Sequence, residues 1–412
     1  MDYFQYKSNQ LQAEDVTIQS ISEQFSTPVY IYSRATLERH WKAFDEAFNG
    51  KPHLICYAVK ANSNIAVLNV LARLGSGFDI VSVGELERVL KAGGDPDKIV
   101  FSGVGKRHDE IRRALVVGIR CFNVEVSTEL DRINSIAVDM GVIANISIRV
   151  NPDVDAQTHP YISTGLKENK FGLAIETAFL EYQRAAAMQS LNVVGLDCHI
   201  GSQLTDTTPF VDALDRVLTL VQRLKKVGID IQHLDLGGGL GIPYTQNETI
   251  LEWDGLIAAL AKIKKEAGVD ELWMELGRYA VGECGHYATP VVECKQNYGQ
   301  QQVILTGGIN HLLRPAVTSQ DFPAALLRES TAPEQAMSLY GPLCTALDCL
   351  GEHTLPSDLN EQDWLVFSQC GAYGFTESMP YFLCHELAAE YVLQNGELTC
   401  VRQAEDASHY LR

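Results

Sequence analysis

The hydrophobic positions of the chain follow two different patterns, and the change between them comes near residue 285. Before that point, short apolar or β-branched runs alternate with longer stretches of helical periodicity, separated by polar or glycine turns. The stretch PFVDALDRVLTLVQRLKKVG is one such helical segment, and its last glycine suits a helix C-cap. The runs predicted as strands are HLICYAVK (53–60), FDIVS (78–82), IVFSG (99–103), CFNVEV (121–126), ISIRVN (146–151), VVGLDCHIGS (193–202), HLDLGGG (233–239) and LWMELGR (272–278).

Strands that alternate with helices form parallel sheets, because each helix carries the chain back to the start of the next strand. Eight such units within about 225 residues are what a closed (β/α)₈ barrel requires. A doubly wound open sheet is the competing architecture. It normally uses fewer strands, and no GxGxxG fingerprint follows the first predicted strand. The sequence therefore predicts an α/β fold built on a TIM barrel.

The C-terminal third of the chain has a β-rich pattern. Segments such as YATPVVECKQ, QQVILTGG and EYVLQNGELTCVRQ alternate or run short, with little helical periodicity, and NYGQ, GEH and QNGE are predicted as turns between them. We therefore expect a barrel domain over residues 30–285. A β-rich domain is expected from residues 1–29 and 286–412 together.

The composition excludes several classes of protein. Of the 412 residues, 46% are hydrophobic and 21% are charged, which is typical of a globular protein. The net charge of -19 argues against a nucleic-acid partner, because affinity for phosphates comes from Lys and Arg. No apolar run is long enough to span a bilayer and no signal peptide is recognisable, so we expect a cytoplasmic protein without a membrane partner. Ten cysteines without CxxC spacing indicate reduced thiols rather than disulfides or a metal site.

Active sites of TIM barrels lie at the C-terminal ends of the strands, so the strand assignment itself selects the candidate residues. These positions supply an amine, an imidazole, a glycine-rich turn, carboxylates and arginines. They are Lys60, Asp79, Ser102, Glu125, Arg149, Asn151, His199, Ser202, Gly237 to Gly239, Glu275 and Arg278.

Each candidate also has an ordinary structural explanation. Lys60 could mark the solvent end of a strand, Glu275 could be a rim carboxylate, and His199 could be a loop histidine. The glycines at 237–239 could form a plain flexible turn, but they follow the seventh strand, where barrel phosphate sites are found. Taken together, an amine for imine formation, a phosphate-binding turn and a carboxylate for a ring nitrogen match the requirements of pyridoxal 5'-phosphate (PLP).

The chain resembles the fold-type III PLP-dependent decarboxylases, and diaminopimelate decarboxylase most of all. The likeness rests on CYAVKAN, GFDIVSVGELE, FSGVGK, HPYISTGLKENKFG, DCHIGSQ, LDLGGGLG and CGAYGF, in this order along the chain. It implies an alanine-racemase-like barrel with a β-domain, a homodimer with shared active sites, and a lid at residues 159–172. The implied roles are Lys60 as the covalent cofactor link, His199 as a ring-stacking group and Glu275 as the partner of the pyridine nitrogen; Ser202, Gly238, Gly239, Gly277, Arg278 and Tyr373 as further cofactor-binding residues; Arg278, Arg314 and Asp348 as substrate-binding residues; and Cys344, from the other subunit, as proton donor.

Three positions depart from the pattern of the diaminopimelate enzymes. The motif at Glu275 reads ELGR instead of EPGR; Thr345 follows Cys344 where an acid is expected, and Thr318 stands where a tyrosine is expected. The stretches GPLCTALD (341–348) and LTGGINHLLRPAV (305–317) are instead similar to the decarboxylases of citrate-based siderophore pathways. We therefore expect α-decarboxylation of a citryl-amino acid, either citryl-serine or a citryl-diamino acid. The alternative is a diaminopimelate decarboxylase that makes L-lysine.

Two other classes are less favoured. A racemase on the same barrel needs a tyrosine base opposite the lysine, where Cys344 occupies the corresponding interface position. A non-catalytic PLP carrier would be a single barrel without the β-domain and without the motifs around Cys344 and Tyr373.

Overall fold

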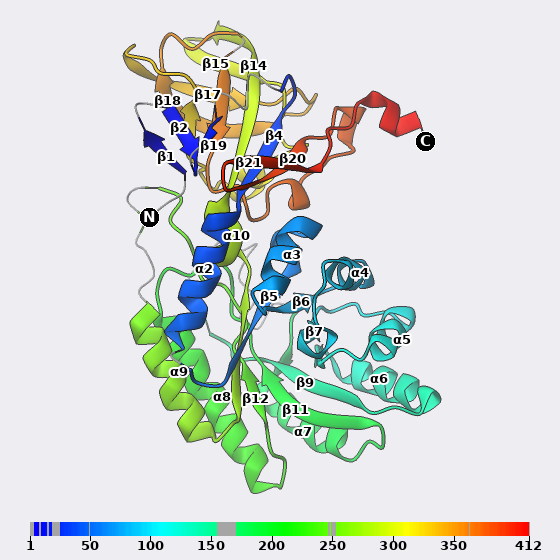
Figure 1. The fold of residues 1–412 in the computed structure, drawn as a ribbon. Helices are drawn as coiled ribbons and strands as arrows, with labels where there is room; N and C mark the ends of the chain where they lie inside the picture. The colour runs from blue at the N-terminus through cyan, green and yellow to red at the C-terminus, as the bar shows by residue number, and fades with distance from the viewer. Residues whose placement is uncertain are drawn as a thin grey trace. The chain divides into compact units, whose positions relative to one another are not determined.

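The computed structural model describes residues 4–7, 10–14, 16–18, 25–48, 50–154, 170–245, 248, 253–361 and 363–411. The chain divides into two compact units. One, the barrel unit, consists of Trp41–Ile242 and Thr249–Tyr279. The other, the β unit, consists of Met1–His40, Pro243–Glu248 and Ala280–Arg412. Most of their helices and strands are labelled in Figure 1.

The barrel unit contains the closed parallel barrel that the sequence predicts. Neighbouring strands pair in the order β5-β6-β7-β8-β9-β11-β12-β13, and β13 pairs in turn with β5, every pair being parallel. The fold is the alanine-racemase-like TIM barrel. The strands are β5 (His53–Ala58), β6 (Gly77–Ile80), β7 (Ile99–Phe101), β8 (Cys121–Val124), β9 (Ala144–Asn151), β11 (Leu191–Asp197), β12 (His233–Asp235) and β13 (Glu271–Leu276).

Helices connect successive strands of the barrel and lie around its outside (Figure 1). A short strand, β10 (Leu173–Ala174), pairs with the end of β9 before the chain enters the next helix. The helices are α2 (Arg34–Ala47), α3 (Ile65–Arg73), α4 (Val83–Lys91), α5 (His108–Val117), α6 (Ser127–Met140), α7 (Ile175–Ala186), α8 (Thr208–Lys226), α9 (Trp253–Ala267) and α10 (Arg278–Val281). Within the described part of the chain, every helix is too short or too polar to cross a lipid bilayer.

Local sequence signals set several helix ends. The side chains of Asn64 and Ser82 each accept a backbone N–H in the first turn of α3 and of α4. Helices α5 and α6 end at Gly118 and Gly141, both in the left-handed conformation that glycine adopts without a Cβ penalty. Polar and glycine positions that interrupt the apolar pattern therefore mark these helix ends.

The β unit contains a larger mixed sheet and a small antiparallel one. The larger sheet has the order β18-β17-β15-β14-β4-β20-β21, and β19 pairs with both β14 and β16. The first three strands form the small sheet. The strands are β1 (Phe4–Lys7), β2 (Gln10–Ala13), β3 (Val16–Thr17), β4 (Val29–Ser33), β14 (Gly285–Asn297), β15 (Gln300–Leu305), β16 (Ala324–Leu326), β17 (Glu334–Tyr340), β18 (Cys349–Pro356), β19 (Trp364–Phe367), β20 (Ala389–Gln394) and β21 (Glu397–Arg402).

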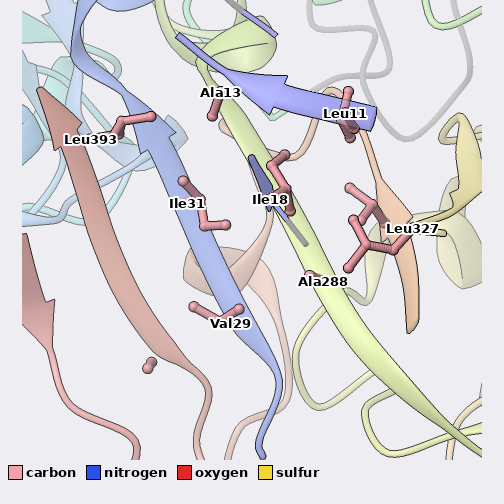
Figure 2. Close-up of a cluster of buried hydrophobic side chains, with 10 residues drawn as sticks. Leu11, Ala13, Ile18, Val29, Ile31, Ala288, Leu327 and Leu393 are labelled. Carbon is pink, nitrogen blue, oxygen red and sulfur yellow. The ribbon is translucent and has the colours of Figure 1, made fainter. Parts of the chain in front are cut away.

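A hydrophobic cluster joins the N-terminal strands to the larger sheet of the β unit. Figure 2 shows the apolar side chains of β2 and of Ile18, which follows β3, packed against those of β4, β14 and β20. Burial of these apolar side chains stabilises the unit by removing their surface from water. The cluster includes Leu11, Ala13, Ile18, Val29, Ile31, Ala288, Leu327 and Leu393.

One predicted turn is part of a strand. NYGQ and QNGE are hairpin turns, with Tyr298, Gly299, Asn395 and Gly396 all at positive φ. GEH, in contrast, lies inside β18, where Gly351 has φ +100° and the register against β17 shifts. The prediction of a turn at GEH was wrong, because an isolated glycine in a strand can also mark a β-bulge.

Candidate active site

Lys60 stands immediately after β5, in a single 3-10 turn (Val59–Ala61). Its Nζ donates a hydrogen bond to Asp79 Oδ2 at 2.9 Å. The Asp79 side chain is fully buried, whereas 40% of the Lys60 side chain is exposed. The amine is therefore accessible to a ligand and is oriented by a carboxylate from the next strand.

Glu275 is buried at the penultimate position of β13, close to two other carboxylates. Oxygen atoms of Asp197, Asp235 and Glu275 all lie within 4.8 Å of one another. Burial, with added repulsion from Asp79 and Asp235, raises the pKa of Glu275 well above its ordinary value. A cationic nitrogen placed against Glu275 would be favoured at this position and would keep the carboxylate ionised.

Burial and neighbouring charge act on the other two acids in the same way. Burial is the largest cause that raises the pKa of Asp235, to about 7, although its Oδ1 accepts the backbone N–H of Gly237. Burial, followed by repulsion from Asp235, raises the pKa of Asp197. Arg149 offsets part of this charge, since its Nε lies 3.9 Å from Asp197 Oδ2.

Arg149 also joins the strand ends at β8 and β9. Its Nη1 donates to Glu125 Oε1 at 2.9 Å, and Glu125 Oε2 accepts the backbone N–H of Gly172 at 2.9 Å. Both oxygens of Glu125 are thus used within the protein, as is Asn151 Oδ1, which accepts the N–H of Asp153. Most of the predicted lid at 159–172 lies outside the described residues, which resume at 170.

The glycine-rich turn after β12 is shaped by close contacts that leave no space for side chains. A Cβ on Gly238 would lie 1.8 Å from the backbone oxygen of Glu275, and one on Gly239 would lie 2.2 Å from that of Gly201. Gly237 and Gly239 also have positive φ, at +64° and +100°. The turn therefore requires glycine, and it is a cradle in which a bound group would meet backbone atoms directly.

His199 follows β11 and contacts this turn. The backbone N–H of Gly238 donates to His199 Nδ1 at 3.0 Å, so the neutral ring carries its proton on Nε2. Burial, followed by repulsion from Arg149 and Lys60, lowers the pKa of His199 well below its ordinary value. The ring is therefore held neutral and in one orientation beside the glycine turn.

Ser202 and Arg278 meet beside the turn. Arg278 begins α10 directly after Gly277 at the end of β13, and its Nη2 lies 3.4 Å from Ser202 Oγ. The loop that carries Ser202 touches Gly239 through Gly201. The barrel unit thus brings together the amine, the imidazole, the glycine turn, the carboxylate, the hydroxyl and the guanidinium that the sequence selected.

The remaining predicted site residues belong to the β unit. Arg314, buried at the start of α11 (Arg314–Thr318), pairs with Glu377 at 2.7 Å and stacks over the Tyr373 ring at 4.6 Å. Tyr373 has φ 55°, a conformation uncommon outside glycine. Thr318, where a tyrosine was expected, donates its hydroxyl to Arg314 O.

Cys344 and Thr345 lie in the loop between β17 and β18. The Cys344 side chain is exposed and reduced. Asp348, four residues later, is buried, and its two oxygens accept the backbone N–H groups of Ile309 and Leu343. The predicted proton donor is therefore accessible, while the carboxylate assigned to substrate binding is engaged by backbone N–H groups.

Sequence reasoning missed Asp197, Asp235 and Glu377 as members of these clusters. Asp197 and Asp235 are the last residues of β11 and β12, two positions before His199 and Gly237, and side chains two residues apart on a predicted strand share a face. That spacing could have identified both acids. Glu377 sits in a 3-10 turn (Phe375–Glu377), and no periodicity in the sequence pointed to it.

Comparison with known proteins identifies the family. The family described as "Pyridoxal-dependent decarboxylase, pyridoxal binding domain" matches residues 34–282. The chain is 50% identical to the diaminopimelate decarboxylase of Haemophilus influenzae over 98% of its length and 97% of the relative. It is 49% identical to that of Vibrio cholerae, over 99% and 97%. The chain belongs to the diaminopimelate decarboxylase family.

Solved structures of this family superpose on the chain. The diaminopimelate decarboxylase of Helicobacter pylori, complexed with L-lysine, has a TM-score of 0.91 and 36% identity and covers 95% of this chain and 98% of its own. The enzyme of M. jannaschii, also in complex with L-lysine, has a TM-score of 0.92 and 33% identity, covering 98% and 96%. The chain is thus a PLP-dependent carboxy-lyase.

The family assignment corrects the predicted substrate. Relatives about half identical over nearly the whole chain are named diaminopimelate decarboxylases, so the expected citryl-amino acid and the place in siderophore biosynthesis were wrong. That prediction rested on residues 305–317 and 341–348, which form only two segments of the β unit. The similarity to the diaminopimelate enzymes instead extends over both units. The racemase and carrier alternatives also give way to the decarboxylase.

Proposed function

We propose that the chain decarboxylates diaminopimelate to L-lysine. The observation that carries this proposal is the 50% identity to diaminopimelate decarboxylases over nearly the full chain, which includes the β unit as well as the barrel. The two solved relatives that hold L-lysine add support, since lysine is what remains when diaminopimelate loses one carboxyl group. We further propose that the enzyme works in the cytoplasm, in keeping with its ten free cysteines.

The barrel residues suit PLP in charge and in space. The glycine turn at 237–239 carries no Cβ that could block a bound group, and Arg278 meets Ser202 beside it, so we assign the phosphate to this corner. Glu275 would hold the ring nitrogen and its proton. His199 would stack on the ring, and Lys60 would form the covalent link.

When bound, PLP supplies an electron sink for the bond between the α-carbon and the leaving carboxylate. The protein's own groups orient the substrate and move the protons. Arg278 and Arg314 would each bind a substrate carboxylate through the paired N–H donors of the guanidinium. Tyr373 would donate its hydroxyl to the cofactor phosphate. Cys344 would deliver a proton to the carbon that has lost CO₂.

A substrate panel tests the function directly. Purified holoenzyme should release CO₂ from meso-diaminopimelate and form lysine, and should leave lysine and ornithine unchanged. Absence of turnover with meso-diaminopimelate would refute the proposed substrate.

The role of Lys60 has a charge-matched test. Lys60→Arg keeps a cation beside Asp79 but has no primary amine, so both the visible absorbance of the bound cofactor and CO₂ release should be lost. Borohydride reduction followed by peptide mass mapping should label position 60 in the unaltered enzyme. A label at another lysine would remove Lys60 from this role.

We also propose a homodimer in which Cys344 serves the site of the partner subunit. Exposed apolar side chains at Met379, Tyr381, Phe382 and Leu383 support this, because a patch of this kind marks a protein contact. If each site combines residues of two subunits, mixing inactive Lys60→Arg and Cys344→Ala chains should restore activity. Random pairing makes about half of the dimers mixed, and each mixed dimer has one intact site of two, so about a quarter of the activity of the unaltered enzyme should return. Activity that stays at the level of the separate variants would contradict shared sites.

A further inference from the structure

The carboxylate of Asp348 joins two backbone segments of the β unit. Its Oδ1 accepts the N–H of Ile309 at 2.7 Å, and its Oδ2 accepts that of Leu343 at 2.7 Å. The residue is only 2% exposed. A buried carboxylate that accepts backbone N–H groups from two separate segments fixes the distance between them.

Two glycines are packed around this carboxylate. A Cβ on Gly308 would lie 2.1 Å from Asp348 Oδ1, and one on Gly341 would lie 2.4 Å from both carboxylate oxygens. The same Cβ on Gly341 would also lie 2.4 Å from the Gly308 Cα. Neither glycine has a positive φ, so glycine is needed at these positions for space rather than for backbone conformation.

The two segments lead directly to two residues of the proposed site. Leu343 precedes Cys344, and the backbone of Asp348 closes the same loop through Gly341 N–H to Asp348 O at 3.1 Å. On the other side, the N–H groups of His311 and Leu312 both donate to Gly308 O at 2.9 Å, and this turn leads into Arg314.

We propose that Asp348 is a positioning residue that holds the Cys344 loop in register with the Arg314 segment, rather than a substrate ligand. This inference rests on the proposed function, in which Arg314 binds a substrate carboxylate and Cys344 delivers the proton. Its physical basis is that both oxygens of Asp348 are already bonded to the backbone and the two glycines close around them. Releasing the carboxylate would free the Cys344 loop from the segment that anchors it, so the thiol would lose its fixed position at the site it serves in the partner subunit.

Asp348→Asn tests the proposal with almost no change in volume. The amide keeps one acceptor oxygen, but its NH₂ group faces the second backbone N–H, so one of the two bonds is lost. We expect kcat to fall on the order of a hundredfold, as displacement of a reacting group by about 1 Å can cause. The KM for meso-diaminopimelate and the absorbance of the bound cofactor should stay close to those of the unaltered enzyme.

Stereochemistry separates positioning from a simple loss of folded protein. In D₂O the unaltered enzyme should place deuterium on one face of the product carbon, whereas Asp348→Asn should give a mixture because solvent competes with the displaced thiol. Partial unfolding would lower the amount of active enzyme without mixing the label. Asp321→Asn, an exposed carboxylate of the same unit, is the matched control and should behave like the unaltered enzyme.

A measurement that does not depend on turnover and a second variant complete the test. Hydrogen exchange should quicken at Ile309 and Leu343 in Asp348→Asn and leave the barrel peptides unchanged. If Asp348→Asn does not fold, Gly341→Ala displaces the carboxylate without removing its charge and should show the same loss of kcat and of label stereochemistry.

The inference is overturned if Asp348→Asn keeps kcat and a single label face, or if only KM rises, since the latter is the signature of a direct substrate contact. Unchanged exchange at Ile309 and Leu343 would overturn it as well. Failure of the proposed function is distinguishable, because the unaltered enzyme would then not turn over meso-diaminopimelate while the exchange result would still stand.

Discussion

At the scale of single residues, the barrel end concentrates negative charge around a few cations. Asp197, Asp235 and Glu275 are buried together, and burial raises the pKa of each. Such a cluster disfavours any further anion but favours a protonated ring nitrogen. Of the charged parts of PLP, the cationic ring thus suits the acids, while the anionic phosphate suits the glycine turn.

Gly238 is the residue where the cradle is most sensitive to added volume. Gly238→Ala would place a methyl group 1.8 Å from the backbone oxygen of Glu275, so the turn and β13 must separate. We expect loss of PLP affinity by at least about tenfold and a fall in stability of roughly 1–3 kcal/mol. Cofactor titration and thermal unfolding measure the two effects.

Gly255 provides the matched control for this substitution. It lies in α9, where an added Cβ would meet nothing within 4 Å. Gly255→Ala should leave cofactor affinity unchanged and raise stability by about 0.5–1 kcal/mol, because alanine favours a helix. Equal effects of the two substitutions would show that the cradle is not tightly packed.

Asp235 makes stability depend on pH. Its pKa in the folded protein is raised to about 7, above the ordinary value of about 4 for the unfolded chain. Between these values the folded state binds more protons than the unfolded state, so this contribution is present below about pH 4 and is lost as pH rises through about 7.

Asp235→Asn cannot titrate and should remove this part of the pH dependence. Between pH 4 and pH 8, the free energy of unfolding of the variant should rise relative to that of the unaltered protein by up to roughly 4 kcal/mol. The rise is smaller to the extent that Asp197 and Glu275, which are coupled to Asp235, share the same proton. Urea unfolding of the cofactor-free enzyme over this pH range measures the difference. A constant difference at all pH values would contradict a raised pKa at Asp235.

At the scale of elements, a buried ion pair connects the loop after β7 to α6. Lys106 Nζ donates to Glu129 Oε1 at 2.8 Å and to the backbone oxygens of Gly103 and Asn123. The two side chains are 1% and 3% exposed. Removing one partner of such a pair leaves a buried charge without compensation.

We predict that Lys106→Met lowers the free energy of unfolding by about 3–5 kcal/mol. The double variant Lys106→Met, Glu129→Gln should recover part of this loss, because the remaining amide is neutral and can still accept the N–H of Glu125. Arg113→Met, which breaks the exposed pair with Glu87, should cost no more than about 1 kcal/mol. Chemical denaturation of all three variants distinguishes a buried pair from a surface one.

At the scale of the whole molecule, the exposed apolar segment 379–383 bears on assembly. Tyr381 is 64% exposed and Leu383 47% exposed, within a chain whose net charge is -19. A high net charge of one sign disfavours self-association, so apolar contacts must overcome that repulsion if the dimer forms.

Phe382→Lys should therefore weaken the dimer by at least about tenfold, since it would bury a charge in the proposed contact. Val292→Lys adds the same charge at an isolated exposed apolar position of β14 and should leave the dimer intact. Sedimentation equilibrium over a range of protein concentrations measures both. A monomeric unaltered enzyme, or a Phe382→Lys variant that associates normally, would contradict this contact.

The sequence predicted the barrel and the residues at its strand ends because both depend on local periodicity. Lys60, His199 and Glu275 follow directly from where each apolar run ends. The buried acids Asp197 and Asp235 are also in strands, but their partners come from other strands, and no single run shows that three carboxylates meet. The bulge at Gly351 was missed for the same reason, since a bulge is defined by the register of two strands.

What the sequence by itself determined was the alternation of strand and helix, the glycine turn and the choice of PLP chemistry, because these follow from side-chain pattern and backbone sterics along the chain. Only the tertiary structure decided which groups share a cluster: the three acids, the neutral ring of His199 and the two segments held by Asp348. The reason is physical. Burial and charge repulsion act between residues far apart in sequence, so pKa shifts and the roles of buried carboxylates exist only once the strands and loops have come together.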